Sequence, residues 1–135
     1  MAKPQPIVLW FYGNTGTGKT RTATEIAQES GLDYWISNDP ELKWFDGYNG
    51  QDYAILDDFR RQKVQFSWML RLLDRYRLLV QIKGGWVNWV PRVIIVTCPV
   101  SPREAFQWID KDGEIQDWDH IEQLLRRIDD VIEFN

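Results

Sequence analysis

Continuous apolar segments alternate along the chain with segments whose apolar residues recur every three or four positions. The apolar segments, typical of strands buried on both faces in a parallel sheet, lie at 7–12, 34–36, 53–56 and 93–96, and residues 131–134 are expected to form a closing strand. Helical spacing predicts helices over 20–30, 66–76 and 121–128. Strands and helices that alternate in this way predict an α/β fold with a central, mostly parallel sheet flanked by helices.

Turn and capping residues mark the ends of several elements. Two strand-like segments at 79–83 and 86–90 flank Gly84-Gly85, which predicts a β-hairpin. Ser101-Pro-Arg-Glu104 has the pattern of a capping box with proline at the first helical position. We expect Asp119-His-Ile-Glu122 to open the last helix in the same way.

Length and composition narrow the class of protein. The chain has 135 residues, 44% hydrophobic and 27% charged, which suits one globular domain and excludes disordered or low-complexity classes. Residues 1–6 contain two prolines and are expected to be the remnant of a linker from a longer protein, with 7–135 forming the domain. The longest apolar run is far too short to span a bilayer, so no membrane partner is expected. The single cysteine, Cys98, fits a reducing compartment.

The charge of the chain is unevenly distributed. The net charge is −4, yet residues 59–109 contain nine basic and two acidic residues, whereas residues 110–135 contain three basic and nine acidic residues. A basic stretch inside an acidic protein is compatible with a local anion-binding surface and equally with a solvated face.

Residues 13–20 match the phosphate-binding pattern G-x-x-x-x-G-K-[ST]. Glycines let backbone N–H groups converge on phosphate oxygens, and the helix that follows presents its positive end. Lys19 is expected to reach the β- and γ-phosphates, and the Thr20 hydroxyl to bind Mg²⁺. The residues expected to bind ATP are Gly13, Asn14, Thr15, Gly16, Thr17, Gly18, Lys19 and Thr20.

Two acidic residues, Asp57 and Asp58, directly follow the apolar segment 53–56. A parallel strand beside the loop would deliver Asp57 to the Mg²⁺ ion, and Asp58 would then orient or deprotonate the attacking water. Taken alone, two acids at a strand end are more often a turn or a cap.

Four segments in the same order give the chain a specific resemblance. Lys43-Trp-Phe-Asp-Gly-Tyr48, Asp57-Asp58-Phe59, residues 70–76 and Ile82-Lys-Gly-Gly85 resemble the helicase domain of circovirus-type replication initiator (Rep) proteins. These proteins are superfamily 3 helicases of small single-stranded DNA viruses. The resemblance covers about residues 7–134 and implies a P-loop NTPase fold, related to AAA+ proteins, with a DNA-binding β-hairpin.

The resemblance implies Mg²⁺-dependent ATP hydrolysis that drives movement on single-stranded DNA during viral rolling-circle replication in the host nucleus. It assigns Lys19, Asp57, Asp58 and Arg127 to catalysis, Arg127 as the arginine finger supplied to a neighbouring subunit. Lys83 would contact single-stranded DNA in the channel of a ring, a hexamer in the full-length protein that associates weakly in this shorter chain. Rotation by ~100° per residue places Arg127 well away from the apolar stripe of its helix, so it is expected at the surface.

The chain also departs from the family. The sensor motif usually ends in asparagine, but here the run is Val96-Thr-Cys-Pro99, so either Thr97 or Cys98 takes over the sensor role or that role is weakened. No two-histidine metal motif is present, since His120 is the single histidine. Nicking and strand-joining chemistry is therefore expected to be absent.

Several residues and two other functions remain open at this point. Lys83 alone is an ordinary solvated lysine, and Trp44 and Tyr48 either contact adenine or pack. Trp86 and Trp89 should lie on opposite faces of one strand, where one of them stacks on bases or both pack. A small-molecule P-loop kinase, or a nucleotide-binding assembly module with negligible turnover, would share the phosphate-binding loop.

Overall fold

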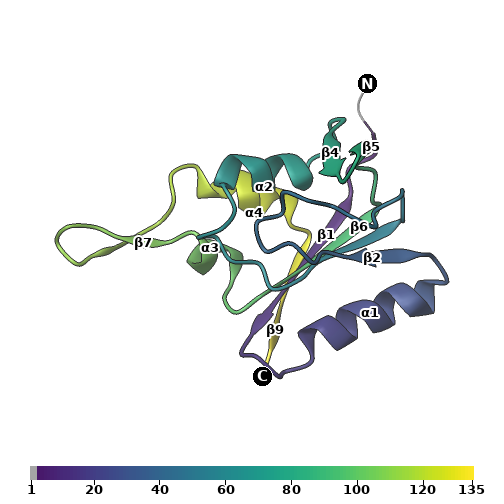
Figure 1. The fold of residues 1–135 in the computed structure, drawn as a ribbon. Helices are drawn as coiled ribbons and strands as arrows, with labels where there is room; N and C mark the ends of the chain where they lie inside the picture. The colour runs from purple at the N-terminus through teal and green to yellow at the C-terminus, as the bar shows by residue number, and fades with distance from the viewer. Residues whose placement is uncertain (1–2) are drawn as a thin grey trace.

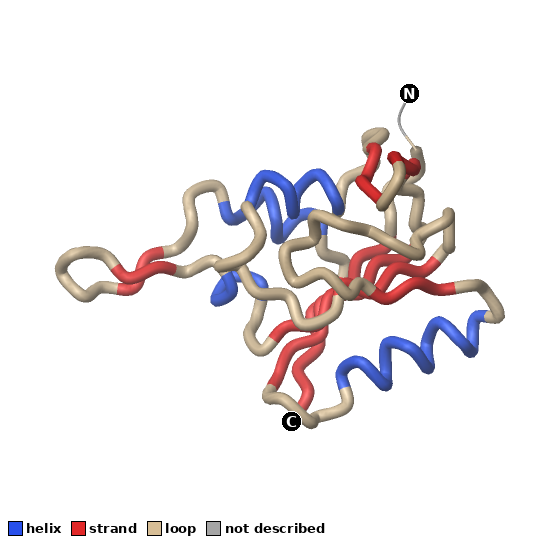
Figure 2. Tube along the Cα trace, viewed as in Figure 1, coloured by secondary structure: helices blue, strands red, loops and turns tan. Residues whose placement is uncertain are grey.

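A five-stranded parallel sheet forms the centre of the domain (Figures 1 and 2). The computed structural model describes residues 3–135. The strand order is β2-β3-β6-β1-β9, and every neighbouring pair is parallel. The strands are β1 (Ile7–Gly13), β2 (Tyr34–Ile36), β3 (Tyr53–Leu56), β6 (Val93–Cys98) and β9 (Asp130–Phe134). The α/β class expected from the alternating pattern is confirmed.

Helices cover both faces of the sheet. In Figure 1, α1 (Lys19–Ser30) lies along one face, and α2 (Phe66–Leu72), α3 (Pro102–Ala105) and α4 (Ile121–Arg127) gather on the other. Under α1 the core is small and includes Phe11, Ala23, Ile55 and Ile95. The larger cluster on the opposite face contains most of the tryptophans, because alternate residues of each strand point there.

Aromatic packing in the core accounts for two of the rings that the sequence left open between packing and ligand contact. Trp89 is fully buried and packs edge-on against Trp35 and Phe45 and at a tilt against Tyr48, with ring centroids 4.8 to 6.0 Å apart. Tyr48 is 2% exposed, and burial raises the pKa of its hydroxyl to about 12. Trp89 and Tyr48 are thus core residues, whereas Trp86 is 61% exposed, as their predicted opposite faces require.

Two antiparallel hairpins lie outside the central sheet. The predicted hairpin is present as β4 (Leu79–Ile82) and β5 (Gly85–Asn88). A second hairpin, β7 (Trp108–Ile109) and β8 (Ile115–Gln116), projects from the body as an arm in Figure 1. The arm is not predictable from the sequence, because its two-residue strands are too short to produce an alternating pattern.

Helix ends differ from the predictions in two places. The expected helix over 66–76 ends at Leu72, and Tyr76 lies 60% exposed instead of on the apolar stripe. The capping box at Ser101 is confirmed, because the Glu104 N–H donates to the Ser101 hydroxyl at 3.3 Å. The second predicted capping box, at residues 119–122, is wrong, because the N-cap of α4 is His120, which has φ 58° and makes no side-chain cap.

The described part of the expected linker, residues 3–6, lies against the domain. The Lys3 N–H donates to the Arg75 carbonyl at 2.8 Å, and the Gln5 amide donates to the Leu73 carbonyl at 3.0 Å. Met1 and Ala2 lie outside the described residues. Over residues 3–135, every helix is too short or too polar to cross a bilayer.

Candidate nucleotide-binding site

The loop between β1 and α1 has the backbone that phosphate binding requires. Gly13 has φ 148°, and a Cβ there would lie 2.2 Å from the Phe134 carbonyl oxygen, so β9 approaches too closely for any other residue. Gly18, at φ 88°, is the N-cap of α1 and provides no side-chain cap, and the first turn of α1 contains no acidic residue. The free N–H groups of a twelve-residue helix therefore face the loop.

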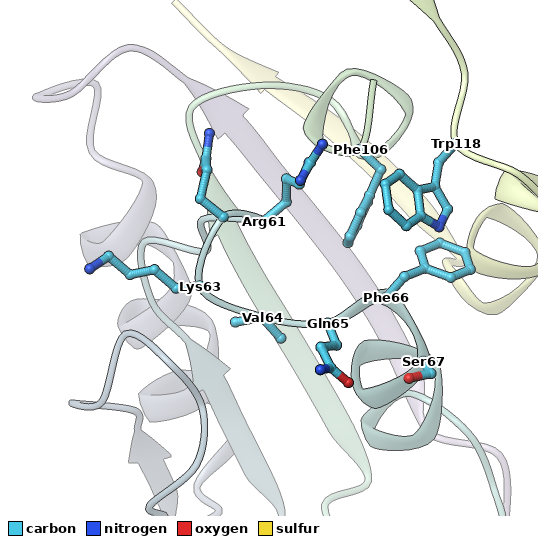
Figure 3. A pocket seen from close by; sticks show the side chains of 9 residues that line it. Arg61, Lys63, Val64, Gln65, Phe66, Ser67, Phe106 and Trp118 are labelled. Atoms are coloured by element: carbon cyan, nitrogen blue, oxygen red, sulfur yellow. The ribbon is translucent and has the colours of Figure 1, made fainter. Parts of the chain in front are cut away.

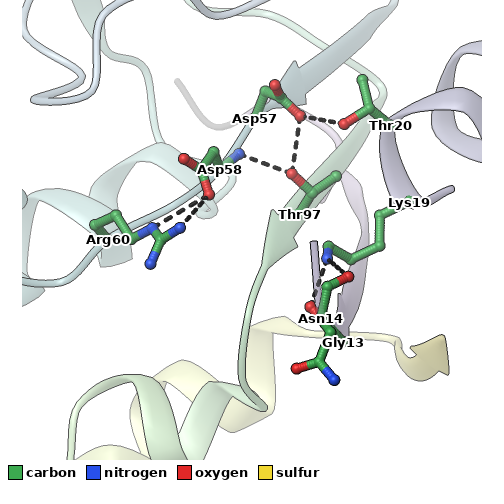
Figure 4. A network of polar contacts seen from close by, with 8 residues as sticks. All are labelled: Gly13, Asn14, Lys19, Thr20, Asp57, Asp58, Arg60 and Thr97. Atoms are coloured by element: carbon green, nitrogen blue, oxygen red, sulfur yellow. Dashed lines mark hydrogen bonds and ion pairs between the residues drawn. The ribbon is translucent and has the colours of Figure 1, made fainter. Parts of the chain in front are cut away.

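Lys19 turns back over the loop. Its ammonium group donates to the carbonyl oxygens of Gly13 and Asn14, the latter at 2.9 Å. Figure 4 shows the side chain pointing toward the loop rather than into solvent. The Lys19 charge thus lies at the mouth of the loop, where it can exchange these carbonyls for phosphate oxygens.

Thr20, Asp57 and Thr97 come together beside the loop (Figure 4). The hydroxyls of Thr20 and Thr97 both donate to Asp57 Oδ1, at 2.6 and 2.9 Å. Asp57 follows Ile55 by two residues, and Thr97 follows Ile95 by two, so both side chains point to the face covered by α1. This alternation is what brings a carboxylate to the start of α1.

Asp57 lies beside the loop although its strand does not pair with the loop strand. β6 pairs with both β1 and β3 and separates them. Thr97, at the end of β6, fills the resulting gap with its hydroxyl, which also accepts the Asp58 N–H at 2.7 Å. Because β6 lies between β1 and β3, its residue Thr97 becomes part of the site.

Only one of the two expected sensor residues contacts the site's polar groups. Thr97 bonds both to Asp57 and to the Asp58 backbone. Cys98 points to the opposite face of β6, where it is 2% exposed within the larger core cluster, and burial raises the pKa of its thiol to about 11. The Cys98 thiol therefore stays protonated at neutral pH and packs in the core, away from Asp57 and Asp58.

Asp58 is held in an unusual position by a residue that the sequence analysis missed. It has φ 54°, a left-handed backbone conformation that aspartate tolerates better than most residues. Its carboxylate accepts from Arg60 Nη2 at 2.9 Å and Nε at 3.2 Å (Figure 4). Both side chains of this pair are exposed, so the pair can open at little cost.

Three hollows lie in the surface of this part of the domain. One of about 650 Å³ lies at the carboxyl ends of β2 and β3, with Asp57, Asp58 and Arg60 in its wall. A smaller one of about 250 Å³ is lined by Gly13, Asn14, Pro99 and the end of β9. A third, of about 680 Å³, has an aromatic wall of Phe66, Phe106 and Trp118 with the Arg61 guanidinium 5.2 Å from the Trp118 ring (Figure 3).

Arg127 lies partly inside the domain, unlike the surface position expected for it. Its Nη2 donates to Asp74 Oδ2 at 2.8 Å, and its Nη1 donates to the Gln123 carbonyl at 2.6 Å. Burial alone would raise the pKa of Asp74, but hydrogen bonds from Arg127 and from the Arg75 N–H hold that pKa below its usual value. The ion pair is therefore intact at neutral pH and is lost only as the pH falls through that lowered pKa.

The turn of the β4–β5 hairpin places Lys83 in solvent, and Asp46 holds this turn. The Asp46 carboxylate accepts the Lys83 N–H at 2.8 Å, and its carbonyl accepts from Trp35 Nε1 at 2.9 Å. No role for Asp46 was derived from the sequence, because its partner lies 37 residues away. The one indication in the sequence was that Asp46 is a short polar residue among the aromatic residues 44–48.

The oxygen atoms near the loop suit a magnesium ion bound together with phosphates. Within residues 3–135 there is no group of three or more His, Cys, Asp and Glu able to hold a metal alone. Thr20 and Asp57 supply a hydroxyl and a carboxylate, the hard oxygen ligands that Mg²⁺ prefers, and Mg²⁺ usually completes its shell with phosphate and water.

A parallel sheet whose first strand runs into a glycine-rich loop and a helix, with a carboxylate beside the helix start, defines a P-loop nucleotide-binding domain. Residues 9–98 match the family model described as RNA helicase, so the chain belongs to that family.

Comparison with curated proteins agrees with the family and with the resemblance to circovirus-type Rep helicase domains. The chain is 39% identical to the replication-associated protein of goose circovirus over 74% of its length, and 38% identical to that of porcine circovirus 1 over 70%. The protein of the same name from porcine circovirus 2 is 34% identical over 89%. The chain spans about a third of the length of these relatives, 32%, 29% and 35% respectively.

Proposed function

We propose that this domain hydrolyses ATP with Mg²⁺ and thereby drives movement along single-stranded DNA, as the motor of a viral replication protein that assembles into a ring. The observation that carries the proposal is the contact of Thr20 with Asp57, 2.6 Å apart, next to Lys19 and the start of α1. Replication-associated relatives and the helicase family support the choice of nucleic acid as the track.

In this proposal each residue has a separate task. Lys19 and the amides of the loop bind and orient the phosphates, which is where most phosphoryl-transfer catalysis originates. Bound Mg²⁺ would neutralise phosphate charge, held by Thr20 and Asp57. Thr97 keeps the Asp57 carboxylate in place. Once the ion pair between Arg60 and Asp58 opens, the Asp58 carboxylate accepts a proton from the attacking water.

Phosphate release is the direct test. Wild-type protein should release phosphate from ATP with Mg²⁺, and faster with single-stranded DNA. Lys19→Ala should weaken ATP affinity about 10- to 100-fold, because charge-assisted hydrogen bonds to the phosphates are lost. The matched control is Lys111→Ala, which removes an exposed lysine in the β7–β8 arm.

Other outcomes favour other functions. ADP formation that requires a small acceptor molecule and releases no free phosphate would favour a kinase. ATP binding without turnover at high protein concentration would favour the assembly module, for which the Asp58–Arg60 pair and Pro99 are the supporting observations.

Lys83 is proposed to contact DNA phosphates from the hairpin turn. Lys83→Ala should lower affinity for single-stranded DNA and reduce the salt slope by about 0.7, the contribution of one phosphate contact on a single strand. The loss should not depend on base sequence, since phosphates carry none. Titrations at several salt concentrations measure it. If the salt slope of DNA binding is unchanged in Lys83→Ala, Lys83 is an ordinary solvated lysine that does not contact DNA.

A further inference from the structure

The β4–β5 hairpin has a second face that the proposed function does not use. Val80, Ile82 and Val87 pack toward the large core cluster. The alternate positions Leu79 and Trp86 point outward and are 53% and 61% exposed. In Figure 1 this hairpin lies beside α2, on the side of the sheet away from α1.

A groove of about 540 Å³ runs between this outward face and α2. Trp86, Leu79 and Gln81 form one wall, and Trp68 and Arg71 of α2 belong to the other. Trp68 is fixed by its Nε1, which donates to the Leu42 carbonyl at 2.8 Å. The groove thus has one anchored tryptophan and one tryptophan with a free ring face.

Three cations line the groove: Lys43, Lys63 and Arg71. None of their charged groups has a hydrogen-bonding or ion-pair partner among residues 3–135, although the Arg71 guanidinium lies 5.5 Å from the Trp68 ring centroid. Figure 3 shows Lys63 extending away from Phe66, Phe106 and Trp118. Glu41 is the one acidic residue of the lining.

Three cations elsewhere in the basic stretch are paired with acidic residues of the domain. Arg60 pairs with Asp58 at 2.9 Å, Arg92 with Asp52 at 3.8 Å and Arg103 with Asp117 at 2.6 Å. The groove therefore keeps a net positive charge that these positions lack. An exposed aromatic ring among unpaired cations is the combination that binds a single strand, with stacking on bases and attraction to phosphates.

We propose that this groove binds single-stranded DNA, with a base stacked on Trp86 and the flanking phosphates near Lys43, Lys63 and Arg71. The proposal rests on the proposed function, which supplies the strand, and adds a contact to bases beyond the phosphate contact of Lys83. Stacking needs an unpaired base, so this contact would distinguish single strands from duplex.

The test compares three DNA ligands of equal length: oligothymidylate, an abasic strand and a duplex. Trp86→Ala should weaken oligothymidylate binding about 10-fold, within the range for loss of one base–aromatic stack. Abasic strand and duplex should bind wild type and Trp86→Ala equally, and Trp86→Tyr should retain most of the affinity. Arg71→Ala should lower the salt slope for every single strand by about 0.7.

Matched controls separate the groove from general surface effects. Trp108→Ala removes another exposed tryptophan, 43% exposed on the β7–β8 arm, and Arg92→Ala removes a cation that is already paired. Both should leave affinity unchanged. As a measurement independent of variants, photocrosslinking of iodouracil-substituted oligonucleotide to wild-type protein should label the peptide that contains Trp86.

The results that would contradict the groove proposal differ from those that would contradict the proposed function. If Trp86→Ala binds oligothymidylate as wild type does while Lys83→Ala binds it more weakly, the groove is not a strand site and the proposed function stands. If wild-type protein binds no single strand, both proposals are wrong. An equal loss on abasic strand would also overturn the stacking contact, because that ligand has no base to stack.

Discussion

Asp58→Asn is expected to lower ATP turnover about 10³-fold, within the range for loss of a general base, and to leave ATP affinity within about twofold. Asparagine has the same shape and also tolerates the left-handed backbone found at φ 54°. The Asp58 N–H bond to Thr97 can therefore persist. What the substitution removes is the carboxylate charge. Single-turnover phosphate release and equilibrium nucleotide binding measure the two quantities separately.

Asp52→Asn is the matched control for this substitution. Asp52 directly precedes β3, whereas Asp58 follows Asp57 at the other end of that strand, and each is paired with an arginine. Asp52→Asn should leave turnover unchanged. If Asp58→Asn reduces ATP affinity as much as Lys19→Ala does, Asp58 acts in binding and not on water.

Arg60→Ala extends the same test to the residue that holds Asp58. If the Arg60 pair keeps the carboxylate away from water, its removal raises basal turnover without DNA. A fall in turnover would instead assign the guanidinium to the phosphates. Both outcomes are measured in the phosphate-release assay.

The sequence was sufficient for the parts of the domain that depend on local pattern. The buried strands, α1 and the loop residues 13–20 follow from apolar runs and from glycines that the backbone requires. The opposite faces of Trp86 and Trp89 follow from strand alternation. In each case neighbouring positions in the chain determine the result.

The parts that were missed depend on contacts between distant segments. Nothing local indicates that β6 lies between β1 and β3, which is a property of the whole sheet. The partners of Lys83 and Arg127, Asp46 and Asp74, are 37 and 53 residues away. The helical periodicity of α4 placed Arg127 away from its own apolar stripe, but α2 packs against α4, and Asp74, just beyond the end of α2, binds the Arg127 guanidinium.

Arg127 either acts as an arginine finger for a neighbouring subunit or forms a structural ion pair with Asp74, and the two roles predict very different effects on ATP turnover. As a finger supplied in trans, a guanidinium stabilises the charge of the transferred phosphoryl group and is worth about 10³-fold or more in turnover. In the structure it is bound to Asp74 with its side chain 23% exposed, and its Nε is buried without an acceptor among residues 3–135. This bound guanidinium would have to leave Asp74 to reach a neighbour.

Turnover per molecule is therefore expected to rise with protein concentration, because association brings a finger to each site. Arg127→Ala should abolish this rise with little change in ATP affinity. Mixing Arg127→Ala with Lys19→Ala should restore part of the activity, since each variant supplies what the other lacks. Phosphate release across a concentration series, with association followed by sedimentation, measures both effects.

Asp74→Asn distinguishes the finger from a structural ion pair. It removes the partner but leaves the guanidinium and its bond to the Gln123 carbonyl. Both Asp74→Asn and Arg127→Ala should lower the free energy of unfolding, by about 1.5–3 kcal/mol for a hydrogen bond to a charged group. Only Arg127→Ala should lose the rise with concentration, when activity is expressed per folded molecule. Equal losses in both variants, or no recovery in a mixture whose subunits associate, would make Arg127 a structural residue that ties α4 to the end of α2.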